Sequence, residues 1–252
     1  MPRHIGSLAR WLAVPACLYL NCAYGLQIDG RLDPDEWQDA ERVSDFRQVV
    51  PLTGEPARVA TESWIQSTPQ GLAIAFRNRH PASVPRTEQR VQRDFEDLVD
   101  QVDVMIDFDA DSRIGYVFTV SSTGAIYDAT LSNERELNKD WDGAWQHAVA
   151  RDEAGWTAEI LIPWHIAPMR AAAGDTRTMK IYVDRLVAAT GERSRSSGSR
   201  SSIFVSMRLS STRKAVGLRW RLGVLAGRSV MRGDLPAEIQ APGRGGYAAE
   251  KA

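Results

Sequence analysis

The fold is decided by residues 102–120, which read VDVMIDFDADSRIGYVFTV. Apolar and polar residues alternate in both halves of this stretch, and successive side chains of a β-strand point to opposite faces of a sheet. The central run DADSR is polar and lacks this alternation, which is typical of a turn. The stretch therefore predicts a hairpin of two antiparallel strands, 102–108 and 114–120, joined at 109–113.

The same two-residue period extends the prediction to both sides of the hairpin. Six further segments carry it: 58–65, 71–77, 125–129, 145–150, 156–162 and 179–186. Eight strand candidates with short polar connections predict an all-β fold, an antiparallel β-sandwich. A helical pattern is confined to Asp33–Trp37, which has an N-cap residue, a proline at the first helical position and early acidic residues. Residues 87–98 fit either a charged surface helix or a loop.

The composition is that of an ordinary globular protein, with 43% hydrophobic and 25% charged residues in a chain of 252. It excludes a disordered chain, a coiled coil and a collagen-like fibre. The net charge of −1 combines three unlike segments. Residues 1–25 hold two basic residues and no acidic one, residues 26–191 hold 17 basic and 28 acidic, and residues 192–252 hold 12 basic and 4 acidic. The acidic central segment is not expected to bind nucleic acid or anionic lipid directly.

The first 25 residues have the layout of a secretory signal peptide. A basic start is followed by the apolar run WLAVPACLYL at 11–20 and by the small residues Ala23 and Gly25. The apolar run is shorter than the roughly 20 residues that span a bilayer as a helix. We therefore expect cleavage after Gly25 and export to the periplasm or the outer membrane of a bacterium. Both cysteines lie in this segment, so the cleaved chain would contain no disulfide, and a lipid-modified cysteine is the alternative.

Residues 191–252 differ in composition from the rest of the chain. The run SRSSGSRSS at 194–202 is basic and of low complexity, and Gly- and Arg-rich stretches follow it. We expect a poorly ordered basic tail here, outside a domain that spans residues 26–190. We also hypothesise that a truncated or frame-shifted gene replaced the normal continuation near Arg193.

Three blocks of the sequence carry a resemblance to a known family: IDGRLDPDEW at 28–37, DQVDVMID at 100–107 and GWTAEILIPW at 155–164. In order and spacing they resemble the family 9 carbohydrate-binding modules. The pattern is most similar to modules at the N-terminus of bacterial outer-membrane-associated proteins with a C-terminal domain of unknown function. The resemblance implies a β-sandwich, export, glycan binding and association with the outer membrane.

The resemblance also implies where a sugar would bind. In sugar-binding members two aromatic rings sandwich a terminal sugar, and one ring lies just before the second block. This sequence has residues 97–99 there, and its nearest ring is Phe95. The sugar-contacting arginine of the family corresponds to about Thr119 on the following strand.

Tryptophans are the other candidates for a glycan site, because aromatic faces stack on the C–H faces of sugars. Trp141 and Trp145 lie in the polar loop NKDWDGAW and are the best surface candidates. Trp64 lies on a predicted strand face and is a further candidate beside Phe95. Three tryptophans of the family blocks are expected in the core instead: Trp37, Trp156 and Trp164.

A calcium site is one interpretation of the turn in the central hairpin. Asp107, Asp109 and Asp111 alternate as in a calcium loop, and hard cations prefer clustered oxygen ligands. Ser112 stands where such a loop has glycine, and Phe118 stands where it has its closing glutamate. A polar hairpin turn is the alternative. The resemblance implies structural calcium more generally, and other candidate ligands are Asp29, Asp33 and Asp100; no other cofactor is implied.

The sequence thus favours an exported, non-catalytic carbohydrate-binding module connected with glycan breakdown or uptake. The alternative is a structural or interaction domain of an outer-membrane protein without sugar affinity. A glycoside hydrolase-associated enzyme is third, because Asp103 and Glu159 offer paired carboxyl groups by residue type alone. The histidines show no metal-ligand spacing, and no nucleophile or nucleotide-binding motif occurs.

Overall fold

The computed structural model describes residues 26–133, 135–171, 176–196 and 203–208, the last of these by its backbone alone. The regular structure of these residues consists of strands, with no helix among them. The strands are β1 (Glu41–Val43), β2 (Phe46–Val50), β3 (Thr61–Ser67), β4 (Gly71–Arg79), β5 (Gln101–Asp107), β6 (Ile114–Ser121), β7 (Ile126–Ser132), β8 (Glu136–Asn138), β9 (Gln146–Arg151), β10 (Gly155–Pro163), β11 (Thr176–Val187), β12 (Glu192–Ser196) and β13 (Ile203–Arg208).

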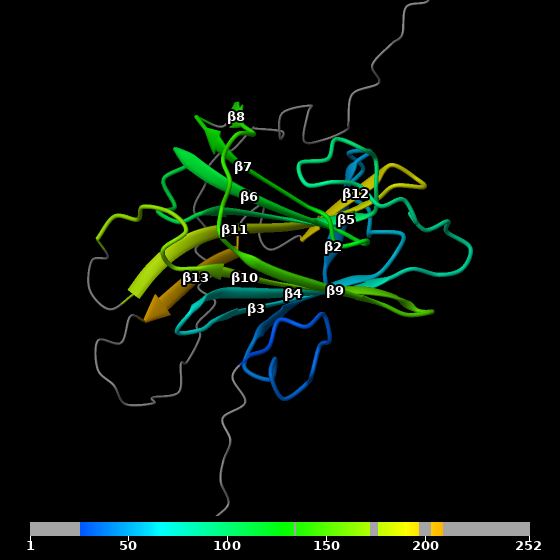
Figure 1. Ribbon diagram of the computed structural model, residues 1–252, viewed down its shortest axis with the longest axis horizontal. Coiled ribbons are helices and arrows are strands. Elements are labelled where there is room, and N and C mark those ends of the chain that lie inside the picture. The colour runs from blue at the N-terminus through cyan, green and yellow to red at the C-terminus, as the bar shows by residue number, and fades with distance from the viewer. Residues whose placement is uncertain (1–25, 134, 172–175, 197–202, 209–252) are drawn as a thin grey trace, which may run out of the picture.

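The strands form two stacked antiparallel sheets (Figure 1). Sheet A has the order β1-β3-β4-β10-β9, and sheet B has the order β2-β12-β11-β5-β6-β7-β8, with β13 also paired to β11. The predicted hairpin is β5 and β6, in which Val104 lies opposite Phe118. The predicted antiparallel β-sandwich is therefore confirmed.

The core lies between the sheets and follows the two-residue period. On β5, Val102, Val104 and Ile106 are fully buried in the main hydrophobic cluster. Asp103 and Met105 lie between them in the sequence and therefore face away from sheet A. We call such a face, turned away from the other sheet, an outer face. The alternation is what places polar residues on the outer faces in regular rows.

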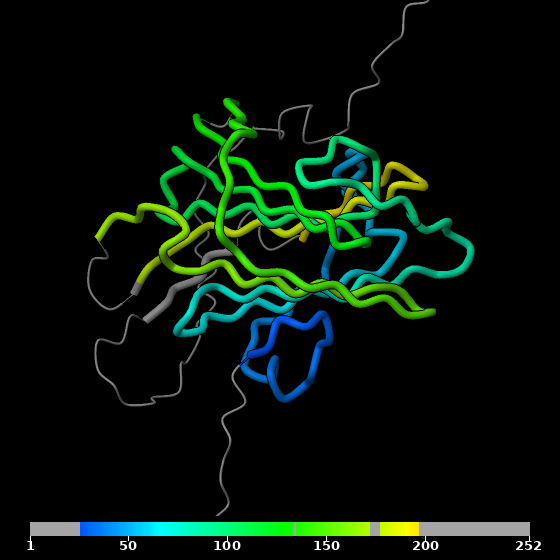
Figure 2. The backbone as a smooth tube through the Cα atoms, in the orientation of Figure 1, coloured from blue at the N-terminus to red at the C-terminus, as the bar shows by residue number. Residues whose placement is uncertain are grey.

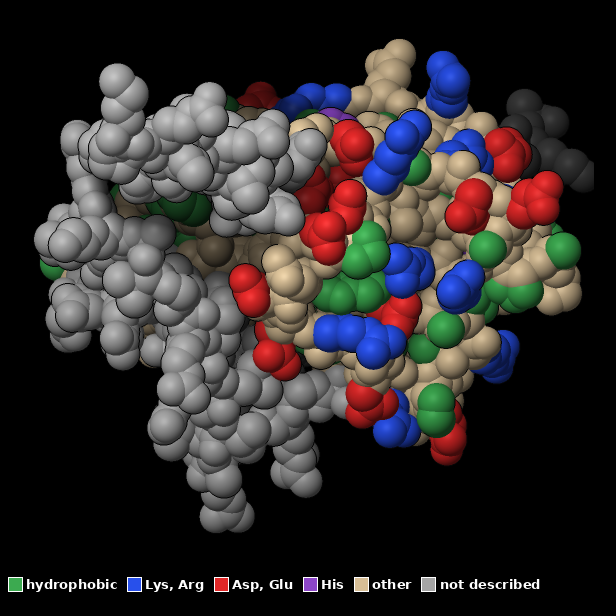
Figure 3. Space-filling view, turned by 90° about the horizontal axis from the view of Figure 1, so that it is seen from below, with side chains coloured by type: hydrophobic (Ala, Val, Ile, Leu, Met, Phe, Trp, Pro, Cys, Tyr) green, Lys and Arg blue, Asp and Glu red, His purple; other side chains and the backbone are tan. Residues whose placement is uncertain are grey.

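A second, smaller apolar cluster lies on the outer face of sheet A. It joins Ala73, Ala75 and Leu161 of that sheet to residues 26–40, which we call the strap. The strap is the blue segment that passes below sheet A in Figure 2. Seen from below, this side of the molecule has acidic and basic side chains interspersed around small apolar areas (Figure 3).

One buried carboxylate holds the strap in place. Glu159 on β10 is fully buried and accepts hydrogen bonds from the backbone N–H groups of Asp29 (3.0 Å) and Gly30 (2.8 Å). Its second oxygen accepts the indole N–H of Trp37 at 3.0 Å. Burial raises the pKa of Glu159, and these donors oppose the rise. Gly30 has a φ of 85°, and a Cβ there would lie 2.7 Å from the backbone of Val149, so only glycine fits.

Two sequence expectations differ from the structure at the local level. Asp33–Trp37 forms a turn and not a helix, with the N–H groups of Glu36 and Trp37 both donating to the Asp33 carbonyl. Of the two alternatives for residues 87–98, the loop is the one observed. No described helix has the length and hydrophobicity needed to cross a membrane.

Sheet B extends past the domain boundary predicted after residue 190. Strand β12 pairs with β11 on one side and with β2 on the other. Its Glu192, Arg193 and Ser194 are buried. The boundary at 190 therefore falls inside the sandwich, and β13 adds a further pairing to the first half of β11. The predicted signal peptide and the rest of the predicted tail lie outside the described residues.

Replacing Glu159 with alanine should destabilise the protein by about 3 kcal/mol, because three N–H donors, two of them buried, lose a charged acceptor. Chemical denaturation followed by tryptophan fluorescence measures this loss. The matched control is Glu62→Ala on β3, whose carboxylate pairs with Arg42 and Arg77 near the surface and should cost less than about 1 kcal/mol. Equal losses in the two variants would contradict the assigned role of Glu159.

A fragment that ends at residue 190 should be much less stable than one that ends at 208. The shorter fragment lacks β12, so β2 loses its sheet partner and the buried Asp103 and Asp184 lose the guanidinium of Arg193. Thermal unfolding of residues 26–190 and 26–208, followed by circular dichroism, compares them. Coincident melting curves would show that β12 is dispensable.

Candidate functional site

Trp145 is a core residue. Only 9% of it is exposed, and its ring meets that of Phe118 edge-on, with centroids 5.4 Å apart. Its indole N–H donates to a carboxylate oxygen of Asp128 at 3.1 Å. A ring enclosed in this way has no free face to offer a sugar.

Trp141 is half-buried and lies at the margin of the same cluster. It makes edge-on contacts with Tyr116 (centroids 5.2 Å apart) and Phe118 (5.9 Å). The backbone of Gly143 lies against the ring, since a Cβ there would be 2.7 Å from the Cη2 atom of Trp141. The ring is thus fixed on several sides while part of it stays accessible.

The other two predicted rings lie on different parts of the molecule. Trp64 is half-buried on the outer face of sheet A, packs against the strap cluster, and has the guanidinium of Arg77 5.1 Å from its ring centroid. Phe95 is half-buried in the long loop between β4 and β5. The structure therefore brings Trp141 and Trp145 into one cluster and leaves Trp64 apart from it.

Ion pairs on either side of Phe95 attach its loop to the loop that carries Trp141. Arg93 donates to Asp142 at 2.7 Å, and Lys139 donates to Glu96 at 2.9 Å. Hence Phe95 and Trp141, far apart in sequence, belong to adjoining loops. Ion pairs between residues more than 40 positions apart leave no periodic pattern in the sequence, so sequence reasoning missed them.

Arg93 also fills a cluster of three acidic residues. Carboxylate oxygens of Asp94, Asp128 and Asp142 lie within 4.8 Å of one another. Arg93 contacts all three, including the fully buried Asp128 at 2.5 Å. The other oxygen of Asp128 accepts the N–H of Gly143 at 2.6 Å. The guanidinium compensates the buried charge, so this cluster is an internal ion-pair network.

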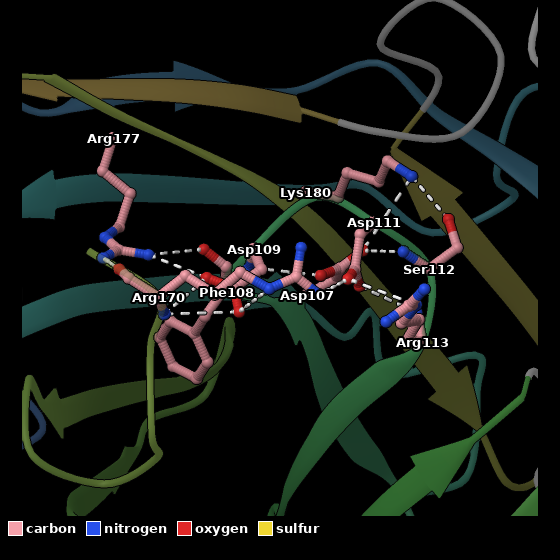
Figure 4. A network of polar contacts seen from close by, with 9 residues as sticks. All are labelled: Asp107, Phe108, Asp109, Asp111, Ser112, Arg113, Arg170, Arg177 and Lys180. Atoms are coloured by element: carbon pink, nitrogen blue, oxygen red, sulfur yellow. Dashed lines mark hydrogen bonds and ion pairs between the residues drawn. The ribbon is translucent and has the colours of Figure 1, made fainter. Parts of the chain in front are cut away.

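The aspartates of the calcium interpretation are paired with cationic side chains (Figure 4). Asp109 accepts from Arg177 at 2.9 Å and from the backbone N–H of Arg170 at 3.1 Å. The side chain of Arg170 in turn donates to Asp111. This network joins the β5–β6 hairpin to the segment that leads into β11.

Asp107 has its own partners in the same turn. It accepts the N–H of Ser112 at 2.7 Å, and the ammonium group of Lys180 lies 3.9 Å away while donating to the Ser112 hydroxyl. Asp100, another candidate ligand, accepts backbone N–H groups from Thr87 and Ala188. Existing hydrogen bonds and ion pairs thus account for these carboxylates, and the calcium site stays a prediction.

The position that the resemblance assigns to a sugar-contacting arginine is occupied differently. Thr119 is buried and donates to Asp103 on the outer face of sheet B at 2.5 Å. The guanidinium beside Asp103 comes from Arg193 on β12. Sequence reasoning missed this residue because Arg193 lies in a stretch whose composition is that of a tail.

Asp103 and Glu159 do not form a catalytic pair. Asp103 lies on the outer face of sheet B, whereas Glu159 lies beneath the strap on the outer face of sheet A. Both sheets and the core separate them. Paired carboxyl groups in glycosidases lie roughly 5 to 10 Å apart across one bond. These two residues are therefore structural.

Comparison with known proteins gives similar structures only. No family model matches the sequence, and no curated protein matches it. One similar structure is a family 9 carbohydrate-binding module from Caldicellulosiruptor kristjanssonii in complex with cellotriose, with a TM-score of 0.46 and 12% identity, covering 68% of this chain and 78% of that chain. Another is a family 9 module from the same organism in complex with glucose, with a TM-score of 0.48 and 12% identity, covering 76% and 95%. A third, from Bacteroides uniformis ATCC 8492, has a TM-score of 0.43 and 14% identity, covering 75% and 87%.

Proposed function

We propose that this protein is a non-catalytic carbohydrate-binding module whose glycan contacts the accessible part of the Trp141 ring. The observation that supports this proposal is a partly exposed indole held rigidly at the edge of the sandwich. Edge-on contacts with Tyr116 and Phe118 fix the ring before any ligand arrives. A fixed ring loses little conformational entropy when it binds, so stacking contributes more of its free energy to affinity.

Polar side chains suited to sugar hydroxyls lie around this ring. Asp142 and Lys139, on the Trp141 loop, are exposed and paired with residues on either side of Phe95. Planar charged groups in such pairs can bond two neighbouring hydroxyls of one sugar. An apolar ring beside a few directional polar groups is the usual composition of a carbohydrate site.

A second polar group, the Asp109–Arg177 pair, lies near the aromatic cluster. Burial, together with the negative charge of Asp109, raises the pKa of Tyr116. Phe108, next to Asp109 in the sequence, meets the ring of Tyr116 edge-on with centroids 5.5 Å apart, so the turn adjoins the tyrosine that contacts Trp141. In this proposal glycan binding needs no metal ion at the Asp107–Asp111 turn, whose carboxylates already have hydrogen-bonding partners.

The alternative function is that of a structural or interaction domain of an outer-membrane protein. Burial of Trp145 and the contact of Arg77 with Trp64 favour it, because they remove two of the four predicted rings from a sugar platform. The binding experiment below separates the two functions, since this alternative requires no affinity for any glycan.

Export of the module, and a role in glycan breakdown or uptake, belong to the same proposal. Leu26 packs into the outer cluster of sheet A. Cleavage after Gly25 would leave this contact intact. In a bacterial host, the secreted protein should begin at Leu26 by N-terminal sequencing, and a retained residue 1–25 segment would contradict the export proposal.

Substitution of Trp141 by alanine should lower glycan affinity at least tenfold, about 1.4 kcal/mol, because the stacking surface is removed. Isothermal titration with cellotriose, glucose and a panel of bacterial polysaccharides measures this. The matched control is Trp145→Phe, which removes the donor to Asp128 and should lower stability by about 1–2 kcal/mol while leaving affinity unchanged.

Two results of that experiment would overturn parts of the proposal. Unchanged affinity in the Trp141 variant would reject this ring as the platform. Absence of binding by the unsubstituted protein across the whole panel would favour the structural alternative.

A further inference from the structure

Two carboxylates lie side by side on the outer face of sheet B. Asp103 of β5 and Asp184 of β11 are opposite each other in the strand register. Their side chains are only 9% and 5% exposed. Two acidic groups held this close together in a buried place repel each other unless cations or protons compensate them.

A single guanidinium nitrogen serves both carboxylates. The Nη1 atom of Arg193 donates to Asp103 at 2.5 Å and to Asp184 at 2.8 Å, and its side chain is 3% exposed. Arg193 belongs to β12, so this contact ties β12 across β11 to β5. Both oxygens meet the same nitrogen, which brings the two negative charges against each other.

The two carboxylates are compensated unequally. Asp184 has a second cation, Arg195, at 3.1 Å. Asp103 has instead the neutral donors Thr119 at 2.5 Å and Gln101 at 3.0 Å. A proton that enters the pair is therefore expected on Asp103.

The groups that face Asp103 are drawn from every strand packed beside it. They are Gln101 on β5, Thr119 on β6, Asp184 on β11, and Arg193 and Arg195 on β12; the next ion pair along this face is Asp107 with Lys180, at 3.9 Å. Two acids and two arginines give a neutral cluster when both acids are ionised. One added proton leaves a single positive charge.

We propose that Asp103 and Asp184 hold one shared proton in mildly acidic solution, and that this proton strengthens the attachment of β12 to sheet B. The protonated carboxyl of Asp103 donates to Asp184 and removes the repulsion between the two. Asp184 stays ionised and keeps both arginines. The attachment of β12 to β11, and through β12 that of β2, is then strongest when the pair holds its proton.

The pKa values of the two acids agree with this asymmetry. Burial raises the pKa of Asp103 to about 6, against the attraction of Arg193. Burial also acts to raise the pKa of Asp184, but Arg193 and Arg195 together hold that pKa below its usual value. Protons thus bind the folded pair at a pH where an unfolded aspartate, with a pKa of about 3.9, is ionised.

The sign of the effect on stability follows from this difference. The folded pKa of Asp103 is higher than the unfolded one, so its contribution to stability is complete below about pH 4 and is lost as the pH rises through about 6. A difference of about two pKa units corresponds to roughly a hundredfold change in the unfolding equilibrium constant.

The variant Asp103→Asn tests the proposal in the full chain, because an amide has the shape of a protonated carboxyl and no charge. At pH 8 its unfolding equilibrium constant should be up to about a hundredfold smaller than that of the unsubstituted protein. The two proteins should become equally stable near pH 4. Urea denaturation at several pH values between 4 and 8 measures both constants.

The matched variant is Asp184→Asn, which should be the less stable protein throughout this range because Arg193 and Arg195 lose their common carboxylate. Two results would overturn the proposal. One is an Asp103→Asn protein that is less stable than the unsubstituted protein at pH 8. The other is a difference in stability between the two proteins that does not change with pH.

Two measurements on the unsubstituted protein decide the matter without any variant. Carbon-detected NMR titration should give the carboxyl of Asp103 an apparent pKa near 6, and a value below 4 would overturn the proposal. Hydrogen exchange, corrected for the intrinsic pH dependence, should show greater protection of the β12 amides at pH 5 than at pH 8. Equal protection at the two pH values would show that the proton does not act on β12.

Discussion

The carboxylate of Glu159 is the contact on which the arrangement of the chain depends. It lies on the outer face of sheet A and collects three N–H groups from the strap, so the first and last of the three recognisable sequence blocks meet at one residue. The strap then covers Ala73 and Ala75, so this part of sheet A is buried on both faces. On the outer face of sheet B such a covering element is absent among the described residues, and buried charges there are compensated by the ion pairs of Asp103, Asp184 and Arg193.

Most of the fold could be predicted from the sequence because alternation is a local property. The two-residue spacing of Val102, Val104 and Ile106 predicts both the strand and its buried face. The same period marks the other long strands. The helix expected at Asp33–Trp37 failed for a tertiary reason. The indole of Trp37 donates to Glu159, which fixes the path of the chain at this point. A five-residue helix would have too few backbone hydrogen bonds to be more stable than the turn that allows this contact.

The site could be predicted only in part. Trp141 and Trp145 lie four residues apart in the same polar loop, and nothing local separates the accessible ring from the buried one. The difference depends on Asp128, a buried acceptor on β7 that takes the indole of Trp145. Arg193 escaped prediction for a related reason. A serine- and arginine-rich run has the composition of a tail. Its pairing with β2 and β11, and the acids on β5 and β11 that bind Arg193, come from distant parts of the chain.

The pairing of β2 with β12 constrains how the chain can fold. Along one edge, residues 46–50 pair with residues 193–196, almost the whole domain later. Their other edge has local hydrogen bonds to residues 54–57. During synthesis β2 therefore emerges long before β12, and the backbone groups of the edge that pairs with β12 stay unpaired until then. Contacts this distant in sequence slow folding, because a large loop must close before the contacts gain any free energy. The edge that joins the beginning of the domain to its end can therefore form only after residues 193–196 have been made.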